Sequence, residues 1–159
     1  MCGYAGFYLN RKRTSQGEME KTITKMANSL EHRGPDDLGI WLDSNKPIAF
    51  GHRRLSIVDI SASGHQPMTS SNNKYVMAYN GEIYNHTQLR KELDSINSGL
   101  NWNGHSDTET LLAGFEVWGI QKTLGKIVGM FSIALWERDS HTLHLIRDRF
   151  GEKPLYYGW

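Results

Sequence analysis

Cysteine is almost absent from this sequence, which has one cysteine, at position 2, among its 159 residues. A single cysteine excludes an intrachain disulfide, and no Cys–Cys or Cys–His spacing typical of a zinc site can be formed with it. The seven histidines are scattered along the chain and form no helical pair of the kind that binds metal. The sequence therefore predicts neither a disulfide framework nor a metal site.

Long apolar runs and an excess of one charge are also missing. The longest apolar run, Met130–Trp136, is the size of a strand and far below the roughly 20 residues that a membrane helix needs. The chain has 18 basic and 17 acidic side chains, so its composition indicates neither a nucleic-acid surface nor a polybasic membrane patch. The N-terminal apolar stretch precedes its basic residues, the reverse of a signal peptide. We therefore expect a cytoplasmic globular protein.

Hydrophobic periodicity predicts strands and helices in separate blocks. Helical spacing predicts one helix over 18–32, a second over 85–97, and a third after the S-x-x-E sequence at 106–109, which has the form of a capping box. Strands are predicted over 3–9, 38–42, 48–55, 75–79, 130–136, 142–146 and 155–159, with a turn at 43–46 and a long loop over 61–73. Helices grouped between antiparallel strands predict an α+β fold.

Cys2 is the first candidate for chemistry. A lone cysteine is usually a small buried hydrophobic residue, but its position gives it a second interpretation. Removal of Met1 would leave a thiol and a free α-amine on the same residue. The amine has an ordinary pKa of about 7.7–8.0, so it can accept the thiol proton at neutral pH. Cys2 is therefore a candidate nucleophile.

Two charged residues are candidates for substrate binding. Arg54 lies in the segment 51–59, where it forms either a surface ion pair or a bidentate contact with a substrate carboxylate. Asp107 follows Ser106 at the start of a predicted helix. It is either a favourable charge in the first helical turn or the partner of a substrate amine. Each interpretation stays open on these residues alone.

The sequence Asn80-Gly81 predicts a turn between an apolar strand and a helix. Such a turn can present a side-chain amide and a backbone N–H together, which are the components of an oxyanion hole. Glu82 beside it can bind an ammonium group. The charged cluster over 147–149 is most simply interpreted as a set of ion pairs.

Together, the segments 1–3, 32–36, 52–59, 80–85, 106–109 and 147–157 resemble the glutaminase half of asparagine synthetase, a class II glutamine amidotransferase with an N-terminal nucleophile fold. The resemblance spans essentially the whole chain. It implies a four-layer αββα sandwich, with two antiparallel sheets between helical layers. It also implies that residues 1–159 are an amidotransferase domain truncated at its C-terminal end, with an ATP-dependent synthetase domain expected beyond Trp159.

The resemblance assigns a role to each candidate. Cys2 would attack the side-chain amide of glutamine with its own amine as base, while Asn80 and Gly81 stabilise the oxyanion. Arg54 would hold the substrate carboxylate, and Asp107 and Glu82 its amino group. Further residues would line the pocket or the entrance of an ammonia channel: Leu55, Ser56, Ile57 and Val58 for the pocket, and Arg33 and Met130 for the channel.

The same resemblance implies that the glutaminase step needs no cofactor, and that ATP and Mg²⁺ belong to the missing synthetase domain, which would convert aspartate to asparagine. The implied partners are glutamine and that synthetase domain; a homodimer is left open, and no nucleic acid or membrane is implied. One alternative is a related amidotransferase that modifies another carboxylate in an antibiotic or surface-sugar pathway. Two others are a catalytically idle binding domain and a self-processing hydrolase of the same fold.

Overall fold

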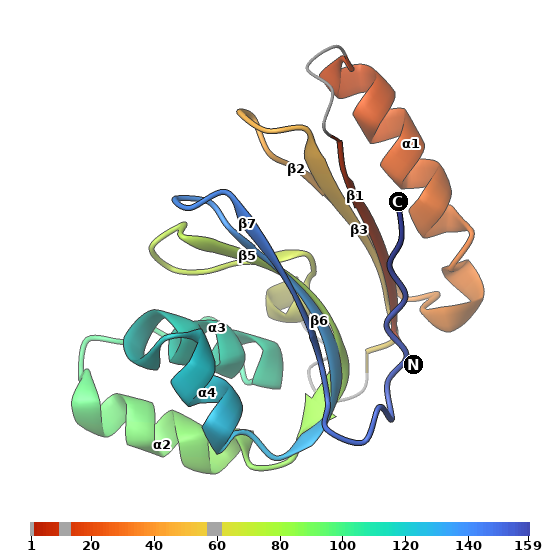
Figure 1. The fold of residues 1–159 in the computed structure, drawn as a ribbon. Coiled ribbons are helices and arrows are strands. Elements are labelled where there is room, and N and C mark those ends of the chain that lie inside the picture. Colours follow the sequence, from red (N-terminus) through yellow and green to blue (C-terminus); the bar gives the residue numbers. More distant parts are fainter. Residues whose placement is uncertain (1, 10–13, 57–61) are drawn as a thin grey trace.

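The four layers of the molecule are a helix, two sheets and a group of helices. A computed structural model describes residues 2–9, 14–56 and 62–159. Figure 1 shows α1 on the outer face of one sheet and α2, α3 and α4 on the outer face of the other. The predicted α+β class and the implied αββα arrangement are therefore confirmed.

The first sheet contains three antiparallel strands in the order β1-β3-β2. These are β1 Gly3–Tyr8, β2 Asp37–Leu42 and β3 Ile48–Arg54. The predicted turn between β2 and β3 is present, and Asp43 Oδ1 accepts two backbone N–H groups in it. Gly3 lies opposite Arg53 in the register, so the start of the chain meets the end of the central strand.

The second sheet contains four antiparallel strands in the order β4-β5-β6-β7. They are β4 Met68–Thr69, β5 Tyr75–Ile83, β6 Gly129–Glu137 and β7 Thr142–Arg147. The predicted hairpin of β6 and β7 is confirmed. The segment predicted as a loop over 61–73 contains a short 3-10 helix, Ala62–Gly64, as well as β4, which pairs with Val76 and Met77 near the start of β5.

Alternation of side chains along β3 and β5 explains why the layers stack. Phe50 packs between the sheets against a fully buried Trp136, whereas its neighbour Ala49 faces α1. Along β5, Ala78 faces the first sheet and Met77 faces the helices. Because neighbouring residues in a strand point to opposite faces, a strand with few polar residues is buried on both sides.

Helix α1, Gln16–Asn28, begins with a complete capping box between Ser15 and Glu18. The sequence predicted that this helix continues to residue 32, which is wrong. The α-helix ends at Asn28, and the Ser29 hydroxyl donates to the Met26 carbonyl at 2.7 Å. A separate 3-10 turn over Glu31–Arg33 follows. Such tighter turns are common at helix ends, and hydrophobic spacing does not reveal them.

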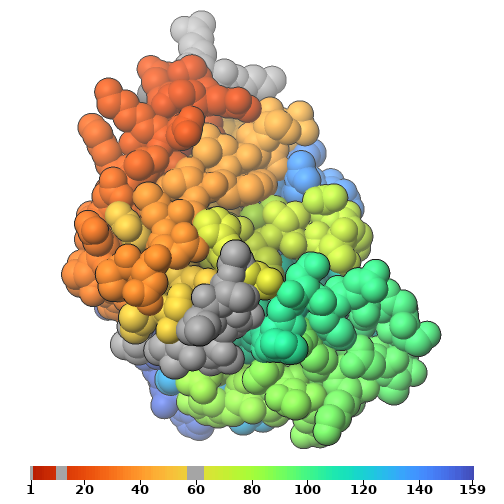
Figure 2. All heavy atoms as spheres, turned by 180° about the vertical axis from the view of Figure 1, so that it is seen from behind, coloured from red at the N-terminus to blue at the C-terminus, as the bar shows by residue number. Residues whose placement is uncertain are grey.

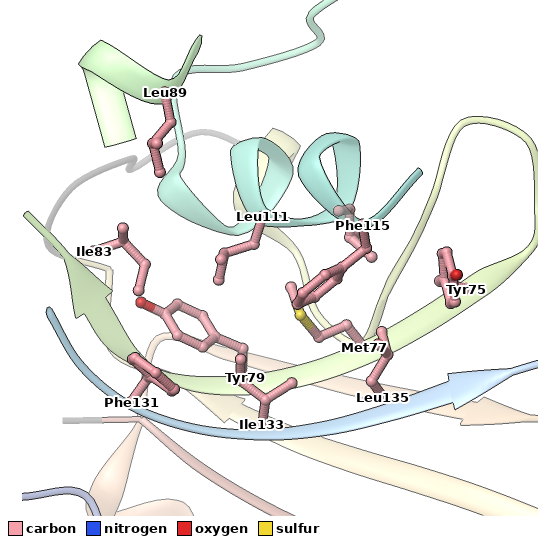
Figure 3. Close-up of a cluster of buried hydrophobic side chains, with 11 residues drawn as sticks. Tyr75, Met77, Tyr79, Ile83, Leu89, Leu111, Phe115, Phe131, Ile133 and Leu135 are labelled. Atoms are coloured by element: carbon pink, nitrogen blue, oxygen red, sulfur yellow. The ribbon is translucent and has the colours of Figure 1, made fainter. Parts of the chain in front are cut away.

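The second helical layer consists of α2 His86–Ile96, α3 Asp107–Trp118 and α4 Ile120–Lys126. Figure 3 shows Leu111 and Phe115 of α3 pointing onto the face of β5 that carries Met77 and Tyr79. The sequence did not predict the seven-residue α4, which is too short for a clear helical pattern.

Only half of the predicted capping box of α3 is formed. Ser106 Oγ accepts the Glu109 N–H at 3.2 Å, as expected. The Glu109 carboxylate instead accepts the N–H groups of Asn103 and Gly104 and pairs with Arg90 at 2.9 Å. The side chain of Glu109 therefore orders the preceding loop rather than the helix start.

The strand predicted over 155–159 is absent from the described residues. Tyr156 and Tyr157 are 91% and 77% exposed, and no strand of the described chain pairs with this segment. An apolar run becomes a strand only where a neighbouring strand accepts and donates its hydrogen bonds. The apolar residues at 155–159 do not by themselves show whether a neighbouring strand is available.

His52 is a polar side chain buried between the two sheets. It is fully buried, and its Nε2–H donates to the Tyr79 carbonyl of β5 at 3.0 Å. Its Nδ1 has no hydrogen-bond partner in the part of the chain that the structure describes. Burial lowers the pKa of His52 to about 4. The imidazole is therefore neutral when it joins the sheets.

This burial predicts sensitivity to acid. Between pH 6.5 and 4 the unfolded chain binds a proton at residue 52 and the folded chain does not, so stability falls as the pH falls. We expect His52 to account for about 2 kcal/mol of the stability lost between pH 7 and pH 5. Urea unfolding of His52→Gln at both pH values should show that much less loss than the parent. The exposed His32→Gln serves as control, and an equal loss in all three proteins would contradict the prediction.

Candidate functional site

A small cavity lies between the ends of β3 and β5 and the start of α3. Its volume is about 110 Å³. The cavity brings together five of the predicted residues, which carry a thiol, a guanidinium, an amide and two carboxylates. Its lining consists of Cys2, Arg54, Leu55, Gly64, Gln66, Tyr79, Asn80, Gly81, Glu82, Ser106, Asp107, Thr108, Met130 and Lys153.

The Cys2 thiol is held against the backbone that follows β3. Its Sγ accepts the Leu55 N–H at 3.3 Å and lies 3.6 Å from the Leu55 carbonyl, to which the S–H can donate. Cys2 precedes β1, whose first residue pairs with the end of β3. The strand pairing therefore places the thiol at the cavity, and the residue stays partly exposed.

Arg54 is the last residue of β3 and is 8% exposed. A Cβ added at Gly64 would overlap its guanidinium, so only glycine leaves room for Arg54 there. The backbone of Arg54 is fixed as well, because its carbonyl accepts the Asp36 N–H at 3.0 Å. Gly34 packs against the same stretch of backbone so closely that it too has no room for a Cβ. The segment 34–36 thus braces the end of the strand.

Asn80 and Gly81 lie inside β5, so the turn predicted for them is wrong. They pair with Ser132 and Phe131 in a ladder that continues to Ile83. Nine consecutive residue pairs with β6 outweigh the local turn preference of two residues. A Cβ on Gly81 would overlap the Met130 carbonyl, so glycine permits the two strands to approach there. The Asn80 side chain is buried at the cavity.

Asp107 is the first residue of α3 and is 6% exposed. Its Oδ2 accepts the Tyr79 hydroxyl at 2.6 Å and the Ile83 N–H at 2.9 Å. Burial and the adjacent Asp107 charge raise the pKa of Tyr79, so the phenol stays protonated and donates. Asp107 thus joins helix and sheet, and it also faces the cavity. Both sequence-based interpretations fit this position.

Some of the other predicted residues line the cavity and some do not. Glu82, Leu55 and Met130 line the cavity, and Glu82 is exposed. Ser56 does not line it; its N–H donates to Asp36. Arg33 also lies outside the lining and packs beside Gly3. Ile57 and Val58 lie outside the described residues.

Sequence reasoning missed two polar residues of the cavity wall. Gln66 Oε1 accepts the Tyr79 N–H at 2.8 Å, which fixes the loop against β5. Lys153 is only 4% exposed, although lysine is rarely buried. Gln66 precedes a proline in a polar segment, and Lys153 follows a glycine turn. Neither setting signals an inward-facing side chain.

The cluster at 147–149 does not form the ion pairs predicted for it among the described residues. Asp148 instead accepts backbone N–H groups from Phe131 and the three residues Phe150, Glu152 and Lys153. Burial alone would raise the pKa of Asp148, but these N–H donors outweigh it and hold the pKa below its usual range. Arg147 donates to backbone carbonyls of the same turn.

A second, larger cavity of about 850 Å³ lies behind the wall of the first. Figure 2 looks onto this side, where the segment near residue 70 (yellow-green) lies next to the segment near residue 100 (green). The two glutamates that line this larger cavity already have partners within the protein. Glu109 pairs with Arg90, and Glu116 accepts hydrogen bonds from Ser71 and Asn72. The smaller cavity gathers the thiol and the predicted charged groups, so it is the candidate site.

Residues 2–9, 14–56 and 62–159 contain no group of three or more His, Cys, Asp or Glu side chains arranged to hold a metal ion. No helix within these ranges has both the length and the apolar character needed to cross a membrane.

Residues 1–159 match the family described as glutamine amidotransferase domain. The chain belongs to this family. It is 39% identical over 157 residues to asparagine synthetase [glutamine-hydrolyzing] 1 of Bacillus subtilis, and 38% identical over 159 residues to asparagine synthetase [glutamine-hydrolyzing] 3 of that organism. The match covers 99% of this amidotransferase chain but only 24% and 25% of those two proteins.

A solved structure shares the fold of this amidotransferase domain. Glutamine phosphoribosylpyrophosphate amidotransferase from B. subtilis, complexed with ADP and GMP, superposes with a TM-score of 0.61 at 22% sequence identity. The likeness covers 79% of this chain and 34% of that one. It supports the arrangement of two antiparallel sheets between helices.

The contact at Gly81 makes a prediction about stability. Gly81→Ala should destabilise the fold by about 1–3 kcal/mol, because the new methyl group would overlap the Met130 carbonyl of a paired strand. Gly125→Ala in α4 is the control, since a Cβ there meets nothing within 4 Å. Urea unfolding at pH 7 measures both. Equal stability of Gly81→Ala and the parent would mean that β6 can shift to accept the methyl group.

Proposed function

We propose that this domain hydrolyses glutamine to glutamate and ammonia, with the Cys2 thiol as nucleophile. The observation that carries the proposal is that Cys2 shares one cavity with Arg54, Asn80-Gly81 and Asp107. Free glutamine carries a carboxylate, an amide and an ammonium group. The cavity provides a cation, two amide-type donors and an acid, one set for each substrate group.

The chemistry would begin on the nucleophilic residue itself. Removal of Met1 frees the Cys2 α-amine, which takes the thiol proton as the sulfur attacks the amide carbon of glutamine. The amine then returns the proton to the departing nitrogen, which leaves as ammonia. Water hydrolyses the resulting glutamyl thioester to glutamate and regenerates the thiol.

The oxyanion of the tetrahedral intermediate needs hydrogen-bond donors that are already in place. The side-chain amide of Asn80 and the backbone N–H of Gly81 are the proposed donors. Both belong to a strand that is paired along its whole length, so they would not have to reorganise during the reaction. Loss of the Asn80 amide should cost roughly 10²–10³ in rate.

Recognition of the amino acid would use the charged residues of the wall. Arg54 has planar donors that suit the substrate carboxylate. Asp107 Oδ2 is engaged by two donors, but an ionised carboxylate has about four acceptor positions, so it can still bind the ammonium group. Glu82 would assist from the exposed side. The cavity of 110 Å³ is small beside the roughly 300–1,000 Å³ of drug-sized pockets, which favours a small substrate.

We further propose that the ammonia serves an ATP-dependent conversion of aspartate to asparagine. The support is the similarity to longer proteins named asparagine synthetase [glutamine-hydrolyzing], of which this chain spans about a quarter. In that case a synthetase domain of the full-length protein uses the ATP and Mg²⁺, and the glutaminase step needs no cofactor. Met130, which lines the cavity beside Gly81, is the proposed entrance to the ammonia route.

The nucleophile is tested by Cys2→Ala. Glutamate release from glutamine should fall to the background of the buffer, because no other cysteine exists in the chain. The mass of the purified parent should also correspond to a chain without Met1. Retention of Met1 in an active protein, or unchanged glutamate release from Cys2→Ala, would refute the mechanism.

The close approach of Gly64 to Arg54 tests the carboxylate site. Gly64→Ala should push the guanidinium away and raise the KM for glutamine about tenfold, equivalent to losing a hydrogen bond to a charged group. Steady-state kinetics with glutamine measure the change. Gly17→Ala, at a helix position where a Cβ meets nothing within 4 Å, is the matched control. A change in kcat with KM unaltered would argue against this role for Arg54.

A further inference from the structure

The backbone of β5 bonds to β6 through every second residue. Just outside the two ends of β5, the Arg138 N–H donates to the Lys74 carbonyl at 2.9 Å and the Tyr84 N–H donates to the Val128 carbonyl at 2.8 Å. In an antiparallel pair such bonds recur at alternate positions. The even-numbered residues of β5 therefore turn their N–H and carbonyl groups toward β6, and the odd-numbered residues turn theirs toward the opposite edge of the strand.

Two side chains hold this opposite edge on either side of Gly81. The Tyr79 N–H donates to Gln66 Oε1 at 2.8 Å, and the Ile83 N–H donates to Asp107 Oδ2 at 2.9 Å. By the same alternation the Gly81 N–H points out of this edge, between the other two. Within the described chain β4 pairs with the start of β5 and does not reach it. Neither neighbouring strand takes the Gly81 N–H, and Gly81 lines the candidate site.

Gln66 is itself held from the side of the first sheet. It is 5% exposed and lines the same cavity as Gly81. A Cβ added at Gly39 of β2 would overlap the Gln66 carbonyl, so the two backbones pack directly against each other. Because a backbone N–H can only donate, the oxygen of the Gln66 amide must be the atom that faces Tyr79. Gln66 thus connects the first sheet to the edge of β5, two residues before Gly81.

We propose that Gln66 is a positioning residue for the oxyanion hole, in which its bond to the Tyr79 N–H sets the direction of the Gly81 N–H. A hydrogen bond weakens steeply as its donor turns away from the acceptor. A small rotation of this edge of β5 would therefore weaken a donor that acts on the transition state. In this role Gln66 acts through the backbone and not on the substrate. The inference rests on the proposed function, which makes the Gly81 N–H an oxyanion donor.

The experiment compares Gln66→Met, which removes the acceptor of the Tyr79 N–H, with Ser70→Ala as a matched control. Ser70 Oγ accepts the Tyr75 N–H at 3.0 Å on the same edge of β5, and Ser70 is also 5% exposed, but it lines the second cavity. Urea unfolding should show a similar loss of stability in both variants, because each leaves one buried N–H unpaired. If Gln66→Met does not fold, Gln66→Asn, which has one carbon fewer to reach Tyr79, takes its place.

Steady-state kinetics with glutamine separate the two variants. We expect the kcat of Gln66→Met to fall about tenfold, less than the roughly 10²–10³ lost with an entire oxyanion donor, while KM changes by less than about twofold. Ser70→Ala should keep the kcat and KM of the parent. Hydrogen exchange measured by mass spectrometry should be faster over residues 79–83 in Gln66→Met, and faster only over residues 75–77 in Ser70→Ala.

The contrary results are distinct from one another. An unchanged kcat in a folded Gln66→Met, or an equal fall in both variants, would overturn the proposal, because the position of Gly81 would then not be the determinant. A rise in KM alone would mean that Gln66 binds the substrate directly. A lower kcat with the parent's exchange over 79–83 would also overturn it, since the strand edge would not have moved. If the parent releases no glutamate, the proposed function fails, and the exchange data still decide whether Gln66 holds this edge of β5.

Discussion

Tyr79 makes hydrogen bonds to three separate parts of the chain, and the arrangement of the site depends on them. Its N–H donates to Gln66, its carbonyl accepts from His52, and its hydroxyl donates to Asp107. The strand is buried on both faces, and an unpaired polar group there costs roughly 1–3 kcal/mol. Each of these bonds therefore fixes an element: the wall of the cavity, the first sheet and the helical layer. The position of Asn80, one residue on, follows from all three.

The candidate site lies where the ordered elements end. The last residue of β3, the residue before β1 and the first residue of α3 supply the guanidinium, the thiol and the carboxylate. Residues at the ends of rigid elements are accessible, and the packed layers behind them still fix their backbones. At two places beside these residues, Gly64 at the end of a 3-10 turn and Gly81 inside β5, the packing has no room for a Cβ. The scaffold thus sets the positions of these groups relative to one another.

The sequence predicted the features that depend on neighbouring residues. Alternating strands, the cap of α3 at Ser106 and the turn after Asp43 all follow from side chains within a few positions. The layer order and the grouping of the site residues came instead from the resemblance to a family. Contacts such as that of Cys2 with Leu55, 53 positions apart, cannot be obtained from local pattern. The Asn80-Gly81 turn was predicted wrongly for the same reason, because its competitor is a strand distant in sequence. The inward position of Lys153 depends on a backbone network around Asp148 that no spacing rule describes.

The thiol count of this chain has a practical consequence. Because Cys2 is the single cysteine and is partly exposed at the cavity, every equivalent of thiol that reacts in the folded protein reports on the same position. A colorimetric thiol titration, which needs no substrate, would therefore report the reactivity of Cys2 alone. A fluorophore attached there would sit at the junction of the two sheets and the helical layer. The single thiol thus gives a specific point of attachment for a label at the candidate site.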